Sequence, residues 1–316
     1  MVSQLIWVLI VIHLKDSMMG LEKGIVTLSF DCEAKWGMAD LDLDWKNKLT
    51  DKNLTEAYEY ILDTLKEYNI PSSFAFVGGM TETKDNFLNK TENLLNYKNH
   101  EKWLAPVFKA AQDNDEGWFL PHILDLCLRD EMHEIASHGY THVPFGNLSI
   151  EEVNLEMQLI QDWSKSKKIN CKTIIYPRNE IRFEELLINY EIYLYRSSPK
   201  LFDRKYFPKY INTFFEEFNI FKKSESLNLT KGLSGGVFIN WKYGPRRIIP
   251  NLISSIRYQS ILNDAVKKKN VAHFWTHPHN FITAPESKII FEKLCKSIKR
   301  KVDANQLIIK RQIDFI

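Results

Sequence analysis

The stretch GIVTLSFDCE, residues 24–33, decides the fold class and carries the first candidate site residues. Its run of β-branched and apolar residues predicts a buried strand over residues 25–30. Asp31 and Glu33 follow at once, and residues two apart in an extended chain point to the same side, with Cys32 opposite. Two converging carboxylates are costly unless they meet a cation or share a proton. The alternative interpretation is a pair of solvated loop acids.

Short apolar runs alternate with amphipathic stretches over most of the chain after Gly24. Apolar residues at helical spacing predict helices over residues 54–68 and 150–163. Further strands are predicted at residues 73–77, 134–137, 173–176, 192–195, 237–239 and 271–276. This alternation predicts an α/β fold with a parallel sheet, either a barrel or a doubly wound sheet. Residues 81–130 break the rhythm, and we interpret them as an insertion into a single domain over residues 21–316, preceded by an extension over residues 1–20.

Composition and charge exclude several classes of protein. The chain has 316 residues, 42 Lys and Arg against 40 Asp and Glu, and a net charge of +2, which gives no electrostatic reason to bind nucleic acid. None of its four cysteines forms a C-x-x-C pair. We therefore expect reduced thiols and a cytoplasmic protein. The apolar run at residues 5–12 is too short to span a bilayer, but it leaves membrane association open.

The segment His138-Gly139-Tyr140-Thr141-His142 follows the predicted strand at residues 134–137. Two imidazoles four residues apart can meet one metal ion if the backbone turns, and Gly139 eases that turn. Either Asp31 or Glu33 would complete a set of two histidines and one carboxylate. Three protein ligands and an open position are typical of a catalytic zinc site. A backbone N–H near Tyr140 or Thr141 could stabilise an oxyanion. The alternative is a chance pair of histidines.

Two later segments also follow predicted strands. In the run from His273 to Asn280, an extended backbone puts His273, Trp275 and His277 on one face. The alternative there is a packed aromatic strand followed by surface histidines. In Tyr176-Pro177-Arg178-Asn179, the arginine could form a bidentate pair with a carboxylate and fix it as a base. The alternative is a surface salt bridge.

Residues 243–247 do not follow a predicted strand, but they include side chains that could bind a sugar or a phosphate. Arg246 and Arg247 follow Gly244-Pro245 and could bind a phosphate of a nucleotide- or lipid-linked sugar, although a solvated helix start is the favoured interpretation. Tyr243 could stack on a sugar ring, although most aromatic side chains belong to the core.

The order of these motifs resembles that of the polysaccharide deacetylases with NodB homology, carbohydrate esterase family four. The resemblance spans roughly residues 24–309. Within this family, the chain is similar to the branch found in surface-polysaccharide gene clusters. Its most specific part is the Ser-His-Gly-x-Thr-His setting of the histidine pair. The matching residues, in order, are Asp31-Cys32-Glu33, Ser137 to His142, Tyr176 to Asn179, and His277-Pro278.

The resemblance implies a deformed (β/α)7-type barrel and a divalent metal ion, usually Zn²⁺. Glu33, His138 and His142 would be the metal ligands, and Asp31 would be the general base. The first motif departs from the commonest pattern, in which two aspartates are adjacent, because Cys32 lies between the two acids here. The roles of Asp31 and Glu33 could therefore be exchanged.

The remaining roles also follow from the matching motifs. Arg178 would orient and tune Asp31, and His277 would be the general acid for the leaving amine. The other candidates, as substrate-binding residues, are Tyr176, Asn179, His273 and Trp275.

The sequence thus predicts a metal-dependent hydrolase that removes an N-acyl group, acetyl or formyl, from an amino sugar of a surface polysaccharide or its precursor. The sugar could be free, nucleotide-linked, lipid-linked or part of a glycan. Two alternatives remain, a non-catalytic barrel that binds glycan or acts as a scaffold, and a hydrolase of a small cyclic amide. The sequence makes no prediction of oligomeric state.

Overall fold

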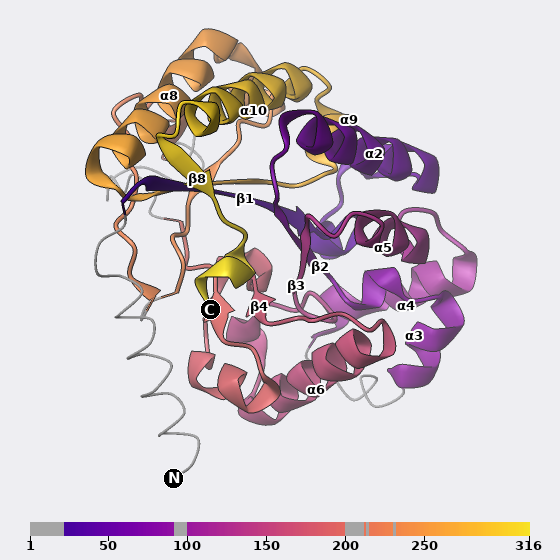
Figure 1. The fold of residues 1–316 in the computed structure, drawn as a ribbon. Helices are drawn as coiled ribbons and strands as arrows, with labels where there is room; N and C mark the ends of the chain where they lie inside the picture. The colour runs from indigo at the N-terminus through magenta and orange to yellow at the C-terminus, as the bar shows by residue number, and fades with distance from the viewer. Residues whose placement is uncertain (1–21, 92–99, 200–211, 213–214, 230–231) are drawn as a thin grey trace.

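The structure, a computed structural model, describes residues 22–91, 100–199, 212, 215–229 and 232–316 (Figure 1). The expected extension over residues 1–20 and the apolar run at residues 5–12 lie outside these described residues. Within the described part of the chain, no helix combines the length and the apolar character needed to cross a membrane.

Strand β1 (Gly24–Cys32) is the centre of a parallel sheet. It pairs with β2 (Ser73–Phe76) on one side and β7 (Val271–Thr276) on the other, and its first residues also pair with β8 (Leu307–Ile309). The sheet order is β5-β4-β3-β2-β1-β7-β6. The other strands are β3 (Glu134–Ser137), β4 (Thr173–Ile174), β5 (Leu194–Tyr195) and β6 (Val237–Phe238).

The two edges of this sheet approach each other. A parallel bridge joins Arg196, the residue after β5, to Leu233, which precedes β6. The backbone N–H of Leu233 donates to the carbonyl of Tyr195 at 2.8 Å, and that of Ser197 donates to Leu233 at 2.8 Å. The sheet is therefore a curled, deformed (β/α)7-type barrel, as expected, and not an open doubly wound sheet.

The side chains of β1 alternate as the sequence predicts. Leu28, Phe30 and Cys32 belong to the main hydrophobic core beneath the helices. Ser29 and Asp31 are polar, buried and on the opposite face. The inside of the barrel is thus polar at its carboxyl end, where parallel α/β folds build active sites.

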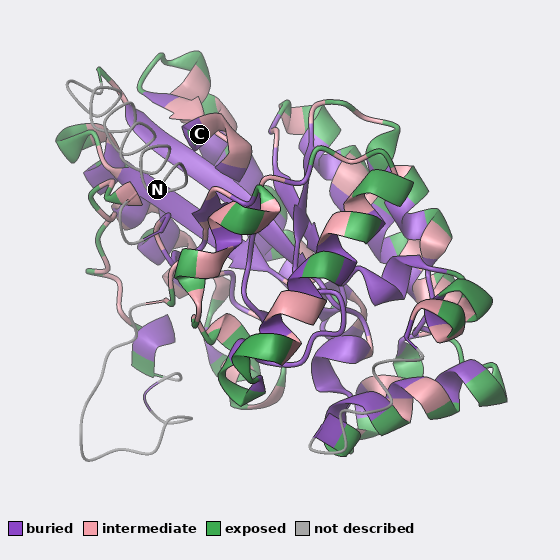
Figure 2. Cartoon of the chain, turned by 90° about the horizontal axis from the view of Figure 1, so that it is seen from below, coloured by how far each residue is buried: buried purple, intermediate pink, exposed green. Residues whose placement is uncertain are grey.

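Helices surround the strands, and their buried faces point inward (Figures 1 and 2). The predicted helices are α2 (Asp51–Tyr68), capped by the Thr50 hydroxyl, and α6 (Ile150–Ser166), which begins with a capping box at Ser149. The other labelled helices are α3 (Lys84–Lys90), α4 (Glu101–Asp113), α5 (Pro121–Leu128), α8 (Asn251–Lys268), α9 (Asn280–Thr283) and α10 (Ser287–Asp303).

The region where we expect the insertion contains α3, α4 and α5, between β2 and β3. It packs against the loop after β1, because the Trp36 indole donates to the Trp118 carbonyl at 2.6 Å. The guanidinium carbon of Arg178 lies over Trp103 of α4, 4.8 Å from the centre of the Trp103 ring. This region therefore supports the loops at the carboxyl end of the barrel.

Candidate active site

Glu33 is the meeting point of three loops at the carboxyl end of the barrel. Its Oε2 atom lies 2.9 Å from His142 Nε2 and 3.2 Å from His138 Nε2. Its Oε1 atom lies 3.4 Å from His277 Nε2. The carboxylate and the three imidazoles come from the ends of β1, β3 and β7. The structure thus brings together side chains that are far apart in the sequence.

The loop after β3 turns sharply to present both histidines. Gly139 and His142 have positive φ angles of 77° and 62°, so the turn that we expected at Gly139 is present. The backbone N–H groups of Tyr140 and Thr141 donate to buried Glu156 of α6, at 2.5 and 2.8 Å. Because Glu156 holds these donors, the expectation that they stabilise an oxyanion is wrong.

The tautomer of His138 is set by the strand beside it. Its Nδ1 donates to the Ile175 carbonyl at 2.8 Å, so the lone pair of Nε2 faces the Glu33 carboxylate. A lone pair against a carboxylate is unfavourable unless a proton or a cation lies between them.

The donor set suits a divalent metal ion. Ligand atoms of Glu33, His138 and His142 all lie within 4.8 Å of one another. Four-coordinate zinc with bonds of about 2.0–2.1 Å has neighbouring ligand atoms about 3.3 Å apart. The two histidine nitrogens lie 2.9 and 3.2 Å from Glu33 Oε2, which is close to this ligand–ligand distance. These residues therefore form a candidate metal site.

Two further histidines, His277 and His279, lie near Glu33. His277 and His279 form a second possible ligand group with Glu33. Their rings stack at 4.9 Å between centres, with 21° between planes, and His279 also stacks on Trp45 at 5.9 Å. Burial, together with the neighbouring His277, lowers the pKa of His279 to about 3. Sequence reasoning did not single out His279, although it lies within the histidine-rich run.

Asp31 is held by Arg196, a residue that sequence reasoning missed. Two hydrogen bonds of 2.7 Å join the guanidinium to the two carboxylate oxygens, and both side chains are buried. Burial raises the pKa of Asp31, but the charges of Arg196 and His138 outweigh it, and the pKa lies below its ordinary value. Arg196 directly follows the strand predicted at residues 192–195, so its strand-end position was the available signal.

Arg178 has other partners. It donates to the Gly37 carbonyl at 2.8 Å and pairs with Asp40 at 2.7 Å. The reason is local, because Arg178 has a left-handed backbone with φ of 58°, and its side chain runs across Trp103. The expectation that Arg178 pairs with Asp31 is therefore wrong.

The four candidate substrate-binding residues divide into two pairs. Asn179 and Trp275 line the cavity beside the site. Tyr176 is buried against Phe145 and does not line this cavity, and neither does His273. The structure thus corrects the expectation for Tyr176 and His273, which lie too deep to line it.

His273 supports the barrel interior behind Asp31. Its Nδ1 lies 2.6 Å from the Ser234 carbonyl, which fixes Nδ1 as the donor, and its Nε2 lies 2.9 Å from the Ser29 hydroxyl. Arg196 also reaches Ser29, at 3.4 Å. Burial and the nearby Arg196 charge lower the pKa of His273 to about 3, so the ring is neutral at ordinary pH.

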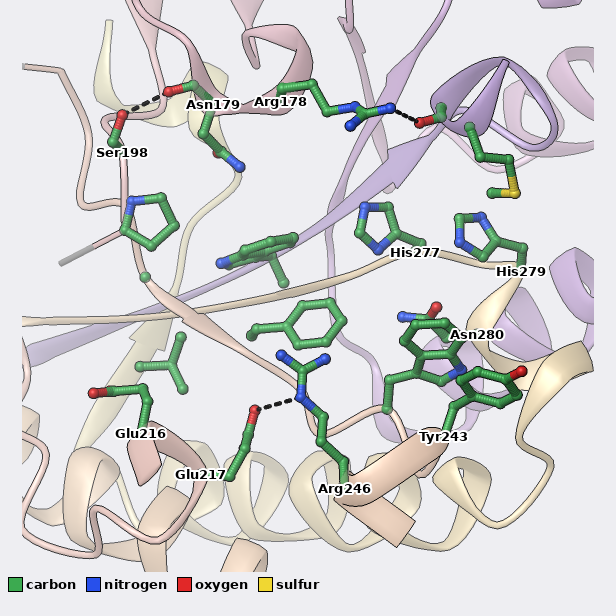
Figure 3. Close-up of a pocket in the computed structure, with 18 of the residues that line it drawn as sticks. Arg178, Asn179, Ser198, Glu216, Glu217, Tyr243, Arg246, His277, His279 and Asn280 are labelled. Atoms are coloured by element: carbon green, nitrogen blue, oxygen red, sulfur yellow. Dashed lines mark hydrogen bonds and ion pairs between the residues drawn. The ribbon is translucent and has the colours of Figure 1, made fainter. Parts of the chain in front are cut away.

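A cavity of about 790 Å³ opens beside His277 (Figure 3). This volume is within the range of small-molecule sites. One wall carries Trp275 and Phe238, whose rings are 4.7 Å apart. Trp241 and Tyr243 stack at 4.8 Å on another part of the lining, with 14° between planes. Flat aromatic faces of this kind suit the apolar face of a sugar ring.

Comparison with known proteins identifies the family. A family model described as polysaccharide deacetylase matches residues 22–181, the part that contains Asp31, Glu33, both histidines of the turn and Arg178. The chain belongs to the polysaccharide deacetylase family. As a member, it is a hydrolase of the type that cleaves the amide bond of acetylated sugars. A search of curated proteins found no match.

Solved structures similar to this chain include three from bacteria. A protein of Mycobacterium smegmatis described as a polysaccharide deacetylase is 12% identical, with a TM-score of 0.49, over 91% of this chain and 93% of its own. A family 4 carbohydrate esterase from Streptomyces lividans, in complex with acetate, is 10% identical, with a TM-score of 0.40 over 90% of each chain. A family 4 acetyl xylan esterase from Clostridium thermocellum, in complex with a cobalt ion, is 12% identical, with a TM-score of 0.40 over 92% of this chain and 89% of its own.

Proposed function

We propose that this deacetylase is a metal-dependent N-deacylase that acts on an amino sugar of a surface polysaccharide or its precursor. The observation that carries the proposal is the convergence of Glu33, His138 and His142 beside an ionised Asp31 and next to His277. A carboxylate free of the metal, a metal-binding trio and an imidazole are the groups that amide hydrolysis needs.

Glu33, His138 and His142 would hold the metal, most simply Zn²⁺, given two imidazoles and one carboxylate. A divalent ion held there supplies a Lewis acid that polarises the acyl carbonyl and activates water. The Ile175 carbonyl orients the His138 ring for this role by fixing its tautomer. We prefer this trio to the group of Glu33, His277 and His279, since it leaves His277 available for proton transfer.

Asp31 would be the general base. It removes a proton from the water whose oxygen forms the new bond to the acyl carbon. Arg196 keeps Asp31 ionised at neutral pH and fixes the plane of its carboxylate through two hydrogen bonds. Each carboxylate oxygen retains a second lone pair that can accept the proton. Arg196 would thus take the positioning role that the family resemblance implies for Arg178.

His277 would be the general acid. Its ring lines the cavity, where the leaving amine would lie, and its Nε2 lies 3.4 Å from Glu33. When the carbon–nitrogen bond breaks, the imidazolium gives its proton to the nitrogen, so that the products are a carboxylate and the free amino sugar. Each of the two proton transfers contributes roughly 10²–10⁴ in rate.

The acyl group would be acetyl or formyl, since both leave by the same chemistry and differ only in the size of the pocket that they need. We also propose a reducing, cytoplasmic location. All four cysteines are buried free thiols, which supports that location.

Mass spectrometry of candidate N-acetyl and N-formyl sugars, after incubation with Zn²⁺-loaded protein, tests the proposal. We expect loss of the acyl group from at least one sugar, and a fall of about 10²–10⁴ in kcat for Asp31→Asn and for His277→Gln. His122→Gln is the matched control, because His122 lies on α5 and contacts Thr55 outside the site.

Three outcomes would contradict the proposal. Unchanged turnover in Asp31→Asn would show that Asp31 is not the general base. Ring opening of a small cyclic amide, with no sugar turned over, would favour the cyclic-amide alternative. Binding of glycan without any turnover would favour the scaffold alternative.

A further inference from the structure

Arg246 is a cation in the wall of the cavity with one long ion pair and no hydrogen-bond acceptor among the described residues. It lies on the short helix η10 (Gly244–Ile248), and only 21% of its side chain is exposed. Its one ionic partner among the described residues is Glu217, whose Oε1 lies 3.8 Å from Arg246 Nε, beyond hydrogen-bond distance. No other acceptor in the described part of the chain takes a hydrogen bond from Arg246. A guanidinium has five N–H donors, so Arg246 keeps donor capacity that no described residue uses, at a position that lines the cavity.

The neighbouring acids are already satisfied by a different arginine. Arg257 donates to Glu217 Oε2 at 2.7 Å and to Glu216 Oε1 at 3.1 Å, and Lys222 lies 3.0 Å from Glu216. Burial, chiefly, lowers the pKa of Arg246, although the Glu217 charge opposes this shift. Among the described residues of this cluster, three cations, Arg246, Arg257 and Lys222, thus lie beside two carboxylates, Glu216 and Glu217.

The Arg246 guanidinium lies near His277, with the Phe238 ring close to both. The guanidinium carbon of Arg246 lies 5.2 Å from the centre of the Phe238 ring, which in turn lies 5.7 Å from the centre of the His277 ring. Arg246 and His277 both line the cavity shown in Figure 3. Tyr243, two-fifths exposed, precedes Arg246 in the same loop. One bound molecule can therefore contact all three side chains.

We propose that Arg246 binds an anionic group, a phosphate ester or a carboxylate, on the amino sugar whose acyl group is removed. The planar fork of a guanidinium matches the oxygens of either anion in a bidentate pair. The aromatic faces of Trp241 and Tyr243 would contact the apolar part of the same substrate. This inference rests on the proposed function and narrows its substrate to acidic or phosphorylated amino sugars.

Calorimetric binding to the full chain, with no turnover required, tests the inference. The probes are N-acetylglucosamine, N-acetylglucosamine 1-phosphate, N-acetylmuramic acid and inorganic pyrophosphate. The variants are Arg246→Gln and its matched control Arg247→Gln, since Arg247 belongs to the same short helix but is exposed and does not line the cavity. We expect an anionic probe to bind wild type and Arg247→Gln about tenfold or more tightly than Arg246→Gln.

The pattern across probes separates the possibilities. Tighter binding of the sugar phosphate and pyrophosphate supports a phosphate ester, and tighter binding of N-acetylmuramic acid alone supports a carboxylate. If no anionic probe distinguishes wild type from Arg246→Gln up to millimolar concentrations, the inference is overturned. Turnover of a neutral sugar with no dependence on Arg246 would overturn it while leaving the deacylase intact. Arg246-dependent binding without any turnover would support the anion site and count against the deacylase.

Discussion

Replacement of Arg196 by methionine removes the cation from the most buried ion pair of the site. Methionine nearly fills the volume, so the change leaves Asp31 buried without its cation. Both side chains are almost fully buried, at 0% and 2% exposed, and are joined by two bonds of 2.7 Å. Removal of one partner from a buried pair costs about 3–5 kcal/mol, whereas an exposed pair contributes about 0–1 kcal/mol. We therefore expect the free energy of unfolding at pH 7 to fall by about 3–5 kcal/mol.

The pH dependence of this loss has a definite sign. In the wild type, the pKa of Asp31 is lowered, so its ion pair stabilises the fold above about pH 3.9 and is lost as the pH falls through the lowered value. In Arg196→Met, burial is no longer opposed by the guanidinium, and the pKa of Asp31 rises. The difference in stability between the two proteins should therefore be largest at neutral pH and shrink toward pH 4.

Urea unfolding at pH 7 and at about pH 4 measures both effects, and the double variant Arg196→Met with Asp31→Asn provides the control. Because the double variant has no uncompensated charge, we expect it to be less destabilised than the sum of the single variants, by about 0.5–3 kcal/mol. A loss of less than about 1 kcal/mol in Arg196→Met, equal at both pH values, would refute the reasoning, since an exposed pair behaves in this way.

Three further changes test the site and its surroundings. His142→Ala should abolish retention of Zn²⁺ after dialysis, measured by elemental analysis, and full occupancy would contradict the ligand assignment. Gly37→Ala should also weaken metal retention with the fold intact by circular dichroism, because a Cβ there would lie 2.1 Å from the Glu33 carboxylate; unchanged retention would show that Glu33 can move aside. His273→Gln should flatten the loss of stability between pH 6 and pH 4 by about 1.4 kcal/mol per pH unit. The reason is that the pKa of His273 is lowered to about 3, so the unfolded chain takes up the proton first; identical slopes in urea melts would disprove this.

Most strands of the sheet were predictable from the sequence because they are short apolar runs. β1, β2, β3 and β7 are fully buried runs, and the predictions match their positions closely. β4, β5 and β6 have only two residues each, yet their apolar runs also predicted them. β8 was not predicted, because three apolar residues after a helix give no usable period.

Site residues that lie within sequence motifs at strand ends were predictable. The residue that pairs with Asp31 was missed, because that contact is made only in the tertiary fold. Strand-end positions predicted that Asp31 or Glu33 would lie near His138 and His142, and the family resemblance selected Glu33. The partner of Asp31 could not be chosen that way, because Arg178 and Arg196 both follow strands. Only the backbone settles the choice. Arg178 turns away with a positive φ, while the bridge to Leu233 directs Arg196 into the barrel.

The pairing of β1 with β8 has a consequence for biosynthesis. Strand β1, which carries Asp31 and directly precedes Glu33, is synthesised more than 200 residues before its neighbours β7 and β8. Contacts between such distant segments form slowly, because a long loop must close first. The metal ligands therefore reach their final arrangement only after nearly the whole domain has been synthesised, and a nascent chain stalled before residue 271 should not yet retain zinc.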